Sequence, residues 1–383
     1  MINSNFLRKY SLLLSSIIFI FICLGWALND IQNLNLKNTN VINNEHYIFP
    51  ILSYYTHFLL ESLFGKIGIV VFSNLVFPYL SFLLLILIFN RFLNNVWSFS
   101  LGILSVAVYT DYPFREFLLK FIKFDFSEGL NYLHSPLIFN FPIPSFSTFI
   151  FLICFYFATE AKYINFLKIS LITFFSTCLI YINAIDAIFF ICFWIFFIFI
   201  RLLRQRYTSL KIFKIYLVQF IIICIGLSFL FYNNNFSFKD YIDYKITFYY
   251  LFFYLIAPSV LIILLSIIQR IDFYEILFKF SYIYVFMFAE TILILIEYTN
   301  FFSINLEIMS SRISQFFLHC LYYVPIIYYS RQSTVGKKFG LESHYISKII
   351  SDLFYYIFTK YNYYYLAIIN FLIIIYLIPW INI

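Results

Sequence analysis

The chain has 383 residues, of which 63% are hydrophobic, 25% aromatic and only 11% charged. A typical soluble domain is about 45–50% apolar and about 25% charged, so this composition excludes a water-soluble globule. The net charge of +7 comes from 25 Lys and Arg against 18 Asp and Glu. Because these charges lie in short stretches between long apolar runs, their placement is more informative than their sum.

Long apolar segments recur along the whole chain and predict an all-α, polytopic bundle of transmembrane helices. A helix needs about 20 apolar residues to cross a bilayer. About 11 segments approach this length, and the range is 10 to 12 because several are short. They are 10–28, 67–90, 97–112, 145–160, 164–182, 186–202, 213–232, 247–268, 273–297, 313–330 and 362–381. With no internal repeat and no soluble insertion, residues 1–383 are predicted to form a single transmembrane domain.

The distribution of Lys and Arg predicts the orientation of these helices, because cytoplasmic loops carry an excess of both residues. An N-terminus in the cytoplasm leaves 17 of the 25 Lys and Arg inside, and it places the C-terminus outside the cell membrane. The basic loop 331–361 is then cytoplasmic and contacts lipid headgroups. A cleaved signal peptide is the alternative for the first segment, since Arg8 and Lys9 precede its apolar core and Gly25-Trp26-Ala27 ends it.

Two outer loops, 29–66 and 111–144, each contain a stretch that is expected to form an amphipathic juxtamembrane helix. In the first loop Ser53, His57 and Glu61 recur at helical spacing among apolar residues and form one polar stripe. In the second loop, residues 112–124 alternate aromatic and charged side chains and are too charged to cross a membrane. Both helices are predicted to lie flat on the outer face. The alternative for each is an ordinary loop helix.

Candidate catalytic residues are the acids that directly follow apolar segments on the outer side. Asp30 follows the first segment and Asp111 ends the third. A carboxylate held at the rim of a bundle can accept a proton from a hydroxyl group or hold a divalent cation. The alternative is a solvated acid that merely ends a helix. Glu45 and His46 are adjacent and point to different faces, so they make a weak ligand pair, and no metal site is predicted.

Two arginines and two further acids complete the set of candidates. Arg312, at the outer end of the tenth segment, either binds a phosphate through its planar fork or anchors the helix at the interface. Arg115 is a second candidate for binding substrate. Asp186 lies in a tight turn, where capping of the backbone is a sufficient role. Glu290 is the only acid deep inside a predicted span, and it should face a cavity or a partner helix.

The order of these features resembles that of the GT-C class of membrane glycosyltransferases, which transfer sugars from polyprenyl-phosphate donors on the outer face. The matching features are Asp30 after the first span, the flat helix that follows His46, Asp111 in the second outer loop, the Phe141–Pro144 entry into a span, and Arg312. The resemblance covers roughly the first 200 residues and is one of layout. It implies that Asp30 takes the catalytic position and that Arg312 contacts the lipid phosphate. The family often has an acidic pair in loop one, whereas Ile31 follows Asp30 here, so the identity of the base and a divalent cation as cofactor both stay open.

Three functions are therefore considered. The first is a glycosyltransferase (hexosyl- or pentosyltransferase) of cell-envelope polysaccharide biosynthesis that acts on a lipid-linked or surface glycan, with Asp30 and Asp111 as catalytic residues and Arg312, Arg115, Glu45 and His46 binding substrate. The second is an O-antigen-type polymerase or ligase, which would require a large outer loop rich in Arg. The third is a transporter or flippase of lipid-linked glycans. The expected partners are a lipid-linked sugar donor, a glycan or lipid acceptor and membrane lipids, and no nucleic acid.

Overall fold

The computed structural model of the protein describes four long stretches of chain, residues 51–107, 145–160, 166–182 and 184–204. It also describes residues 13, 16–17, 19–20, 24, 221, 260, 263–264, 276, 279–282, 285 and 324–329. Every regular element in this part of the chain is a helix. The prediction of an all-α fold is therefore confirmed for the described residues.

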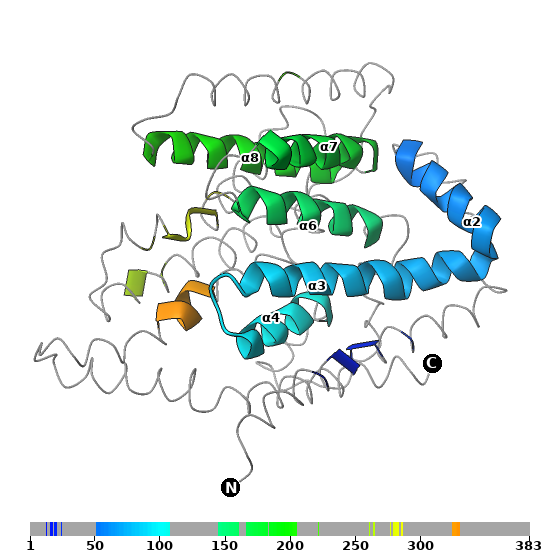
Figure 1. Ribbon diagram of the computed structural model, residues 1–383, viewed down its shortest axis with the longest axis horizontal. Coiled ribbons are helices and arrows are strands. Elements are labelled where there is room, and N and C mark those ends of the chain that lie inside the picture. The colour runs from blue at the N-terminus through cyan, green and yellow to red at the C-terminus, as the bar shows by residue number, and fades with distance from the viewer. Residues whose placement is uncertain are drawn as a thin grey trace, which may run out of the picture.

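The first long described stretch, residues 51–89, is helical, with a kink in its first half and a π-helical segment near its middle. Helix α2 (Ile51–Val71) leads through a π-helical segment, η2 (Phe72–Val76), into α3 (Phe77–Phe89). Within α2 the backbone bends at Gly65, which has φ 66° and ψ −171°. This conformation is essentially restricted to glycine. The bend therefore separates the first part of α2, residues 51–64, from the rest of the helix (Figure 1).

Four further helices follow in the described part of the chain. Helix α4 (Asn95–Ala107) follows a tight turn, and its first turn is capped by Asn94, whose side-chain oxygen accepts a hydrogen bond from the Trp97 amide (3.1 Å). Helices α6 (Ser145–Glu160), α7 (Phe166–Ile182) and α8 (Ala184–Arg204) come next in the chain. Helices α4 and α6 pack against α3, and helices α7 and α8 pack against α6. Their bounds agree within two residues with the predicted segments 145–160, 164–182 and 186–202. Helix α4 covers residues 97–107 of the predicted segment 97–112, whose last five residues lie outside the described ones.

Aromatic contacts show the relative directions of the helices. The ring of Phe77, at the start of α3, lies 4.9 Å from that of Phe146, at the start of α6, and Arg91, just after α3, is bonded to Thr159 near the end of α6. Helices α3 and α6 therefore run parallel. Helix α8 is parallel to α6 as well, because Phe155 contacts Phe193 at 5.0 Å. In a bundle of successive spans, each helix runs opposite to the one before it in the chain. The parallel directions of α3, α6 and α8 agree with this alternation.

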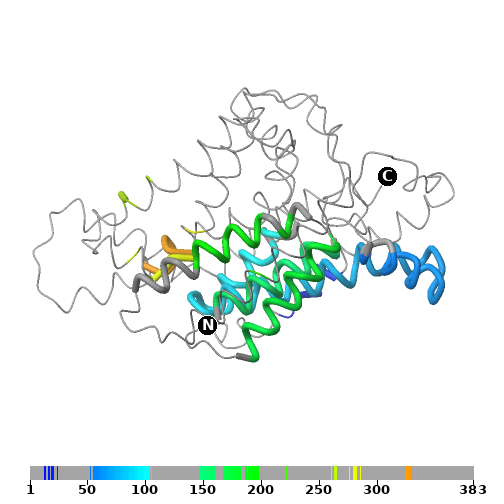
Figure 2. The backbone as a smooth tube through the Cα atoms, turned by 90° about the horizontal axis from the view of Figure 1, so that it is seen from above, coloured from blue at the N-terminus to red at the C-terminus, as the bar shows by residue number. Residues whose placement is uncertain are grey.

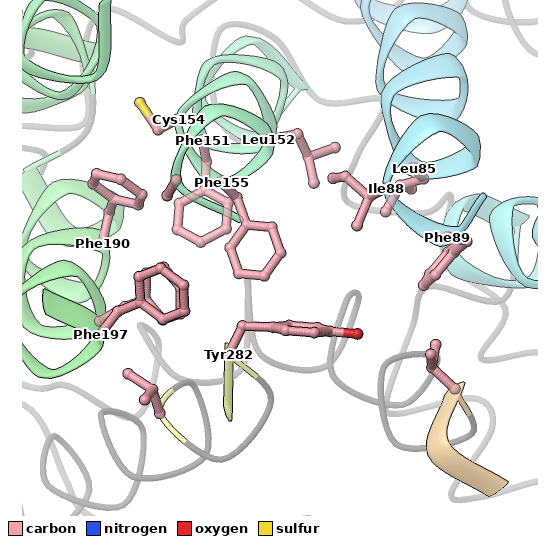
Figure 3. Close-up of a cluster of buried hydrophobic side chains, with 14 of the residues drawn as sticks. Leu85, Ile88, Phe89, Phe151, Leu152, Cys154, Phe155, Phe190, Phe197 and Tyr282 are labelled. Atoms are coloured by element: carbon pink, nitrogen blue, oxygen red, sulfur yellow. The ribbon is translucent and has the colours of Figure 1, made fainter. Parts of the chain in front are cut away.

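The core between these helices is built largely from aromatic side chains. Figure 3 shows Phe151 and Phe155 of α6, Phe190 and Phe197 of α8, Phe89 of α3 and Tyr282 turned toward one another. All of them are at most 4% exposed. The hydroxyl groups inside the helices bond mostly to carbonyl oxygens of their own helix, as Ser100 does to Val96 (2.9 Å) and Thr177 to Thr173 (2.7 Å). These hydroxyl groups are thereby satisfied without water.

One helix among the described residues, Tyr55–Phe89, is long and apolar enough to cross a membrane, and Phe146–Thr159 and Leu167–Ile182 are shorter apolar helices. A buried core helix of a soluble protein can meet the same criterion of length and composition. The structure therefore establishes the helices and their packing, while the count of about 11 spans stays a prediction. The structure divides the stretch 51–89 at Gly65, whose non-helical backbone separates residues 51–64 from the following helix, within two residues of the division that the sequence predicts.

Candidate functional site at the α2 end of the bundle

The six residues that the sequence selects for a site, Asp30, Glu45, His46, Asp111, Arg115 and Arg312, lie outside the described residues, and so does Glu290. The structure does describe the helix ends that flank the segments carrying the first five of them. These ends are Ile51, which follows the segment of Glu45 and His46, and Ala107 and Ser145, which enclose the segment of Asp111 and Arg115.

These helix ends lie on the same side of the molecule. Helix α4 returns beside α3, as the contact between Phe82 and Phe99 shows (5.9 Å), so Ala107 lies near the start of α3. The start of α6 lies there too, because α3 and α6 are parallel. Both Figures 1 and 2 show the first part of α2 at this end. We call it the α2 end, and the opposite end, where α3 turns into α4, the Arg91 end.

Five buried polar residues lie toward the α2 end of their elements, and we call them the polar layer. They come from three elements and are Ser73 and Asn74 of η2, Ser147 and Thr148 of α6, and Asp186 of α8. Each is at most 6% exposed. The Ser73 hydroxyl donates hydrogen bonds to the Val70 carbonyl (3.0 Å) and to the Asn74 side-chain oxygen (2.9 Å). This polar layer contrasts with the aromatic core beside it.

The register of the helices brings Asp186 into this layer. Phe151 and Phe155 of α6 face Phe189 and Phe193 of α8, at 6.0 and 5.0 Å between ring centroids. Continuing the same register toward the helix starts makes Thr148 level with Asp186. The carboxyl group is only 1% exposed and lies in the first turn of α8, where the helix dipole favours a negative charge. Asp186 thus lies within the first turn of α8, whereas the sequence predicts it in a tight turn between two helices.

The π-helical segment was not anticipated from the sequence. A π-helical turn inserts an extra residue into a helix, and such turns occur frequently at functional sites. Here it interrupts the helix between the bend at Gly65 and Pro78, and it carries Ser73 and Asn74 into the interior. The only sequence signal for this segment is the polar pair within the otherwise apolar span predicted over 67–90.

Charged side chains of α2 lie further out at the same end. The imidazole Nδ1 of His57 is 3.9 Å from a carboxylate oxygen of Glu61, one helical turn later, and the two side chains are 30% and 44% exposed. This confirms that His57 and Glu61 share one face of a helix. Among the residues that the structure describes, no three His, Cys, Asp or Glu side chains are grouped closely enough to hold a metal ion.

The Arg91 end has a different chemistry, based on cations and tyrosines. The Arg91 guanidinium donates to the Thr159 hydroxyl (2.5 Å) and to the Tyr156 carbonyl (3.2 Å), and it stacks on the Tyr156 ring at 4.2 Å. Lys279 lies 4.0 Å from the ring centre of Tyr328 and donates to its hydroxyl. The three Arg91 contacts fix the turn after α3 to the end of α6.

Comparison of the chain with protein-family models, with curated proteins and with solved structures gives no match. The function must therefore be argued from the residues themselves and from the arrangement of the helices.

Proposed function

We propose that this protein is a multi-pass membrane glycosyltransferase that transfers a sugar from a polyprenyl-phosphate donor to a lipid-linked or surface glycan. The proposal includes a bundle of about 11 spans, an N-terminus in the cytoplasm, a C-terminus outside and catalysis at the outer face. It rests on the layout of the sequence and on one observation of the structure. The helix ends that flank the two acid-bearing segments lie on the same side of the bundle, at the α2 end, where the buried polar layer also lies.

The observation supports the proposal because a transferase needs both its acids near one place. Asp30, Glu45 and His46 precede α2, and Asp111 and Arg115 follow α4. Had Ile51 and Ala107 been at opposite ends of the bundle, the two segments would have entered opposite faces of a membrane. Their location at one end is the arrangement that two cooperating outer loops require.

The proposed reaction has a simple balance of atoms and charge. A carboxylate, Asp30 or Asp111, accepts the proton of the acceptor hydroxyl, whose oxygen forms a bond to the anomeric carbon of the donor sugar. The bond between that carbon and the phosphate oxygen breaks, and the phosphate leaves with the electron pair. Arg312 and Arg115 would bind this phosphate through their planar guanidinium groups, with Glu45 and His46 contacting substrate and the isoprenoid lying between the helices.

The decisive experiment removes one carboxylate charge at a time in the whole protein. Asp30→Asn and Asp111→Asn should each abolish sugar transfer in cells at an unchanged protein level. The matched control is Glu61→Gln, an exposed carboxylate on α2 outside the proposed machinery, which should keep full transfer. Full activity of both aspartate variants would reject the catalytic assignment.

Turnover in proteoliposomes separates this proposal from the alternatives. Purified protein with a defined polyprenyl-phosphate sugar should release polyprenyl phosphate and a glycosylated acceptor. Movement of the lipid-linked sugar across the bilayer without any product would indicate a flippase instead, and elongation of a lipid-linked polymer would indicate a polymerase.

A further inference from the structure

The first part of α2 exposes large apolar side chains that the other described residues leave uncovered. Tyr55, Leu59 and Leu63 follow one another at intervals of four residues and are each between 56% and 63% exposed. Phe58, beside them, is 60% exposed. Residues four apart lie on one face of a helix, so these side chains form a continuous strip, which we call the apolar row. Ile67, just past the bend, is 57% exposed as well.

The remaining faces of this helix are arranged in a definite order around its axis. Thr56 and Leu60, next to the row, are the more buried positions, and Leu60 is only 6% exposed. His57 and Glu61 follow beyond them. The face packed on the bundle is therefore flanked by an apolar strip on one side and by the polar side chains of His57 and Glu61 on the other. A helix at the boundary between acyl chains and water requires this order.

We propose that the apolar row is inserted into the lipid leaflet at the α2 end, so that residues 51–64 bind the membrane surface from the side of the bundle. The occupant is the acyl region of the lipids. Three observations support this choice: the row belongs to the first part of Tyr55–Phe89, the helix that is long and apolar enough to cross a membrane; exposed Ile67 continues it past the bend; and the polar pair His57 and Glu61 lies on the other flank. The inference rests on the proposed membrane location.

Gly65 forms the bend that lets residues 51–64 lie beside the bundle at the membrane surface. Its φ of 66° turns the chain from the first part of α2 into the following helix, and no atom lies within 4 Å of where a Cβ would stand. Three residues later, a Cβ at Gly68 would lie only 2.2 Å from the Phe64 Cβ. The two glycines therefore allow the helix to fold back across the end of the bundle, as Figure 1 shows for α2 and α3.

Photocrosslinking tests the inference on the full chain in vesicles of phosphatidylethanolamine and phosphatidylglycerol with radiolabelled acyl chains. The variant Leu63→p-benzoylphenylalanine should acquire several-fold more lipid label than the same substitution at Glu61, on the charged flank, or at Leu60, which faces the bundle. Equal labelling at the three positions would overturn the inference. A covalent dimer through Leu63 would also overturn it, because a second copy would then cover the row.

A probe at Phe174 separates failure of this inference from failure of the membrane assignment. Phe174 lies on α7 and is 61% exposed, far along the chain from α2. Lipid label at Phe174 with none at Leu63 would reject the insertion of the row alone. Label at neither position would reject the membrane location as well. Both positions are exposed, so the substitutions leave the packed core intact.

Discussion

Gly65 is the residue on which the path of α2 depends. Its backbone conformation is one that residues with a side chain rarely adopt, and a non-glycine residue held there costs of order 1–3 kcal/mol. We expect Gly65→Ala to lower the stability of the purified protein by about this amount. Since the Cβ itself would meet nothing, the loss would come from the backbone alone.

Circular dichroism during unfolding in detergent measures the stability of the variant. The same measurement on Ser62→Ala gives the comparison. Ser62 is exposed on the same helix and bonds only to the Leu59 carbonyl (2.9 Å), so its replacement should change little. Equal stability of both variants would show that Gly65 does not hold the bend observed here.

Arg91 shows how a single residue can connect two helices. Its guanidinium binds a hydroxyl and a carbonyl of α6 and stacks on the Tyr156 ring. Lysine keeps the charge but lacks the planar fork. We therefore expect Arg91→Lys and Thr159→Val each to lower stability, by about 1–3 kcal/mol for a charged hydrogen bond.

A double-mutant cycle checks the Arg91 contact directly. If the two side chains interact as observed, the double variant should lose less than the two single losses together, with a coupling of about 0.5–3 kcal/mol. Additive losses would contradict the hydrogen bond between Arg91 and Thr159.

At the scale of the elements, if the helices lie in a bilayer, the packing of α6 against α8 depends on the fit of their side chains more than on removing apolar surface from water. In a bilayer the unfolded reference also lies in an apolar medium, so the transfer contribution to burial is small and packing remains. Phe155 is fully buried and contacts Phe193 and Tyr282, whereas Phe174 is 61% exposed.

Phe155→Ala and Phe174→Ala form a matched pair that tests this argument. A buried cavity of about 100 Å³ at Phe155 would cost about 2 kcal/mol from the dependence on cavity volume. Replacement of the exposed Phe174 should leave the free energy of unfolding almost unchanged when this side chain faces lipid or detergent. Unfolding by sodium dodecyl sulfate in mixed micelles measures both, and a similar loss for the two variants would contradict the observed core.

Regular helices of this fold were predictable from the sequence, whereas its irregular positions were not. Apolar length alone located α6, α7 and α8 within two residues, because a helix is the simplest way to satisfy backbone polar groups in an apolar setting. The bend at Gly65 and the π-helical segment depend on packing against neighbouring helices. The polar layer combines residues from η2, α6 and α8, and one sequence contains no information about such distances.

At the scale of the whole molecule, the two ends of the bundle differ in their ionisable side chains, and this difference predicts the orientation of the bundle in a membrane. The Arg91 end contains Arg91 and Lys279, and the sequence assigns both to the cytoplasm by the excess of basic residues. The α2 end contains the Asp186 carboxylate and the His57–Glu61 pair. If the helices are spans, these two ends face opposite sides of a membrane.

Labelling of introduced cysteines in intact cells tests this arrangement. Glu61→Cys, at the α2 end, should react with a membrane-impermeant maleimide added outside. Asn95→Cys, exposed at the start of α4 on the Arg91 end, should react only after the membrane is permeabilised. Cys154, Cys178 and Cys192 are free cysteines of α6, α7 and α8. Labelling of the protein without an introduced cysteine measures their contribution to the signal. The reverse pattern would invert the predicted orientation, and with it the proposed outer catalytic face, whereas labelling of both positions from outside would contradict a membrane-spanning bundle altogether.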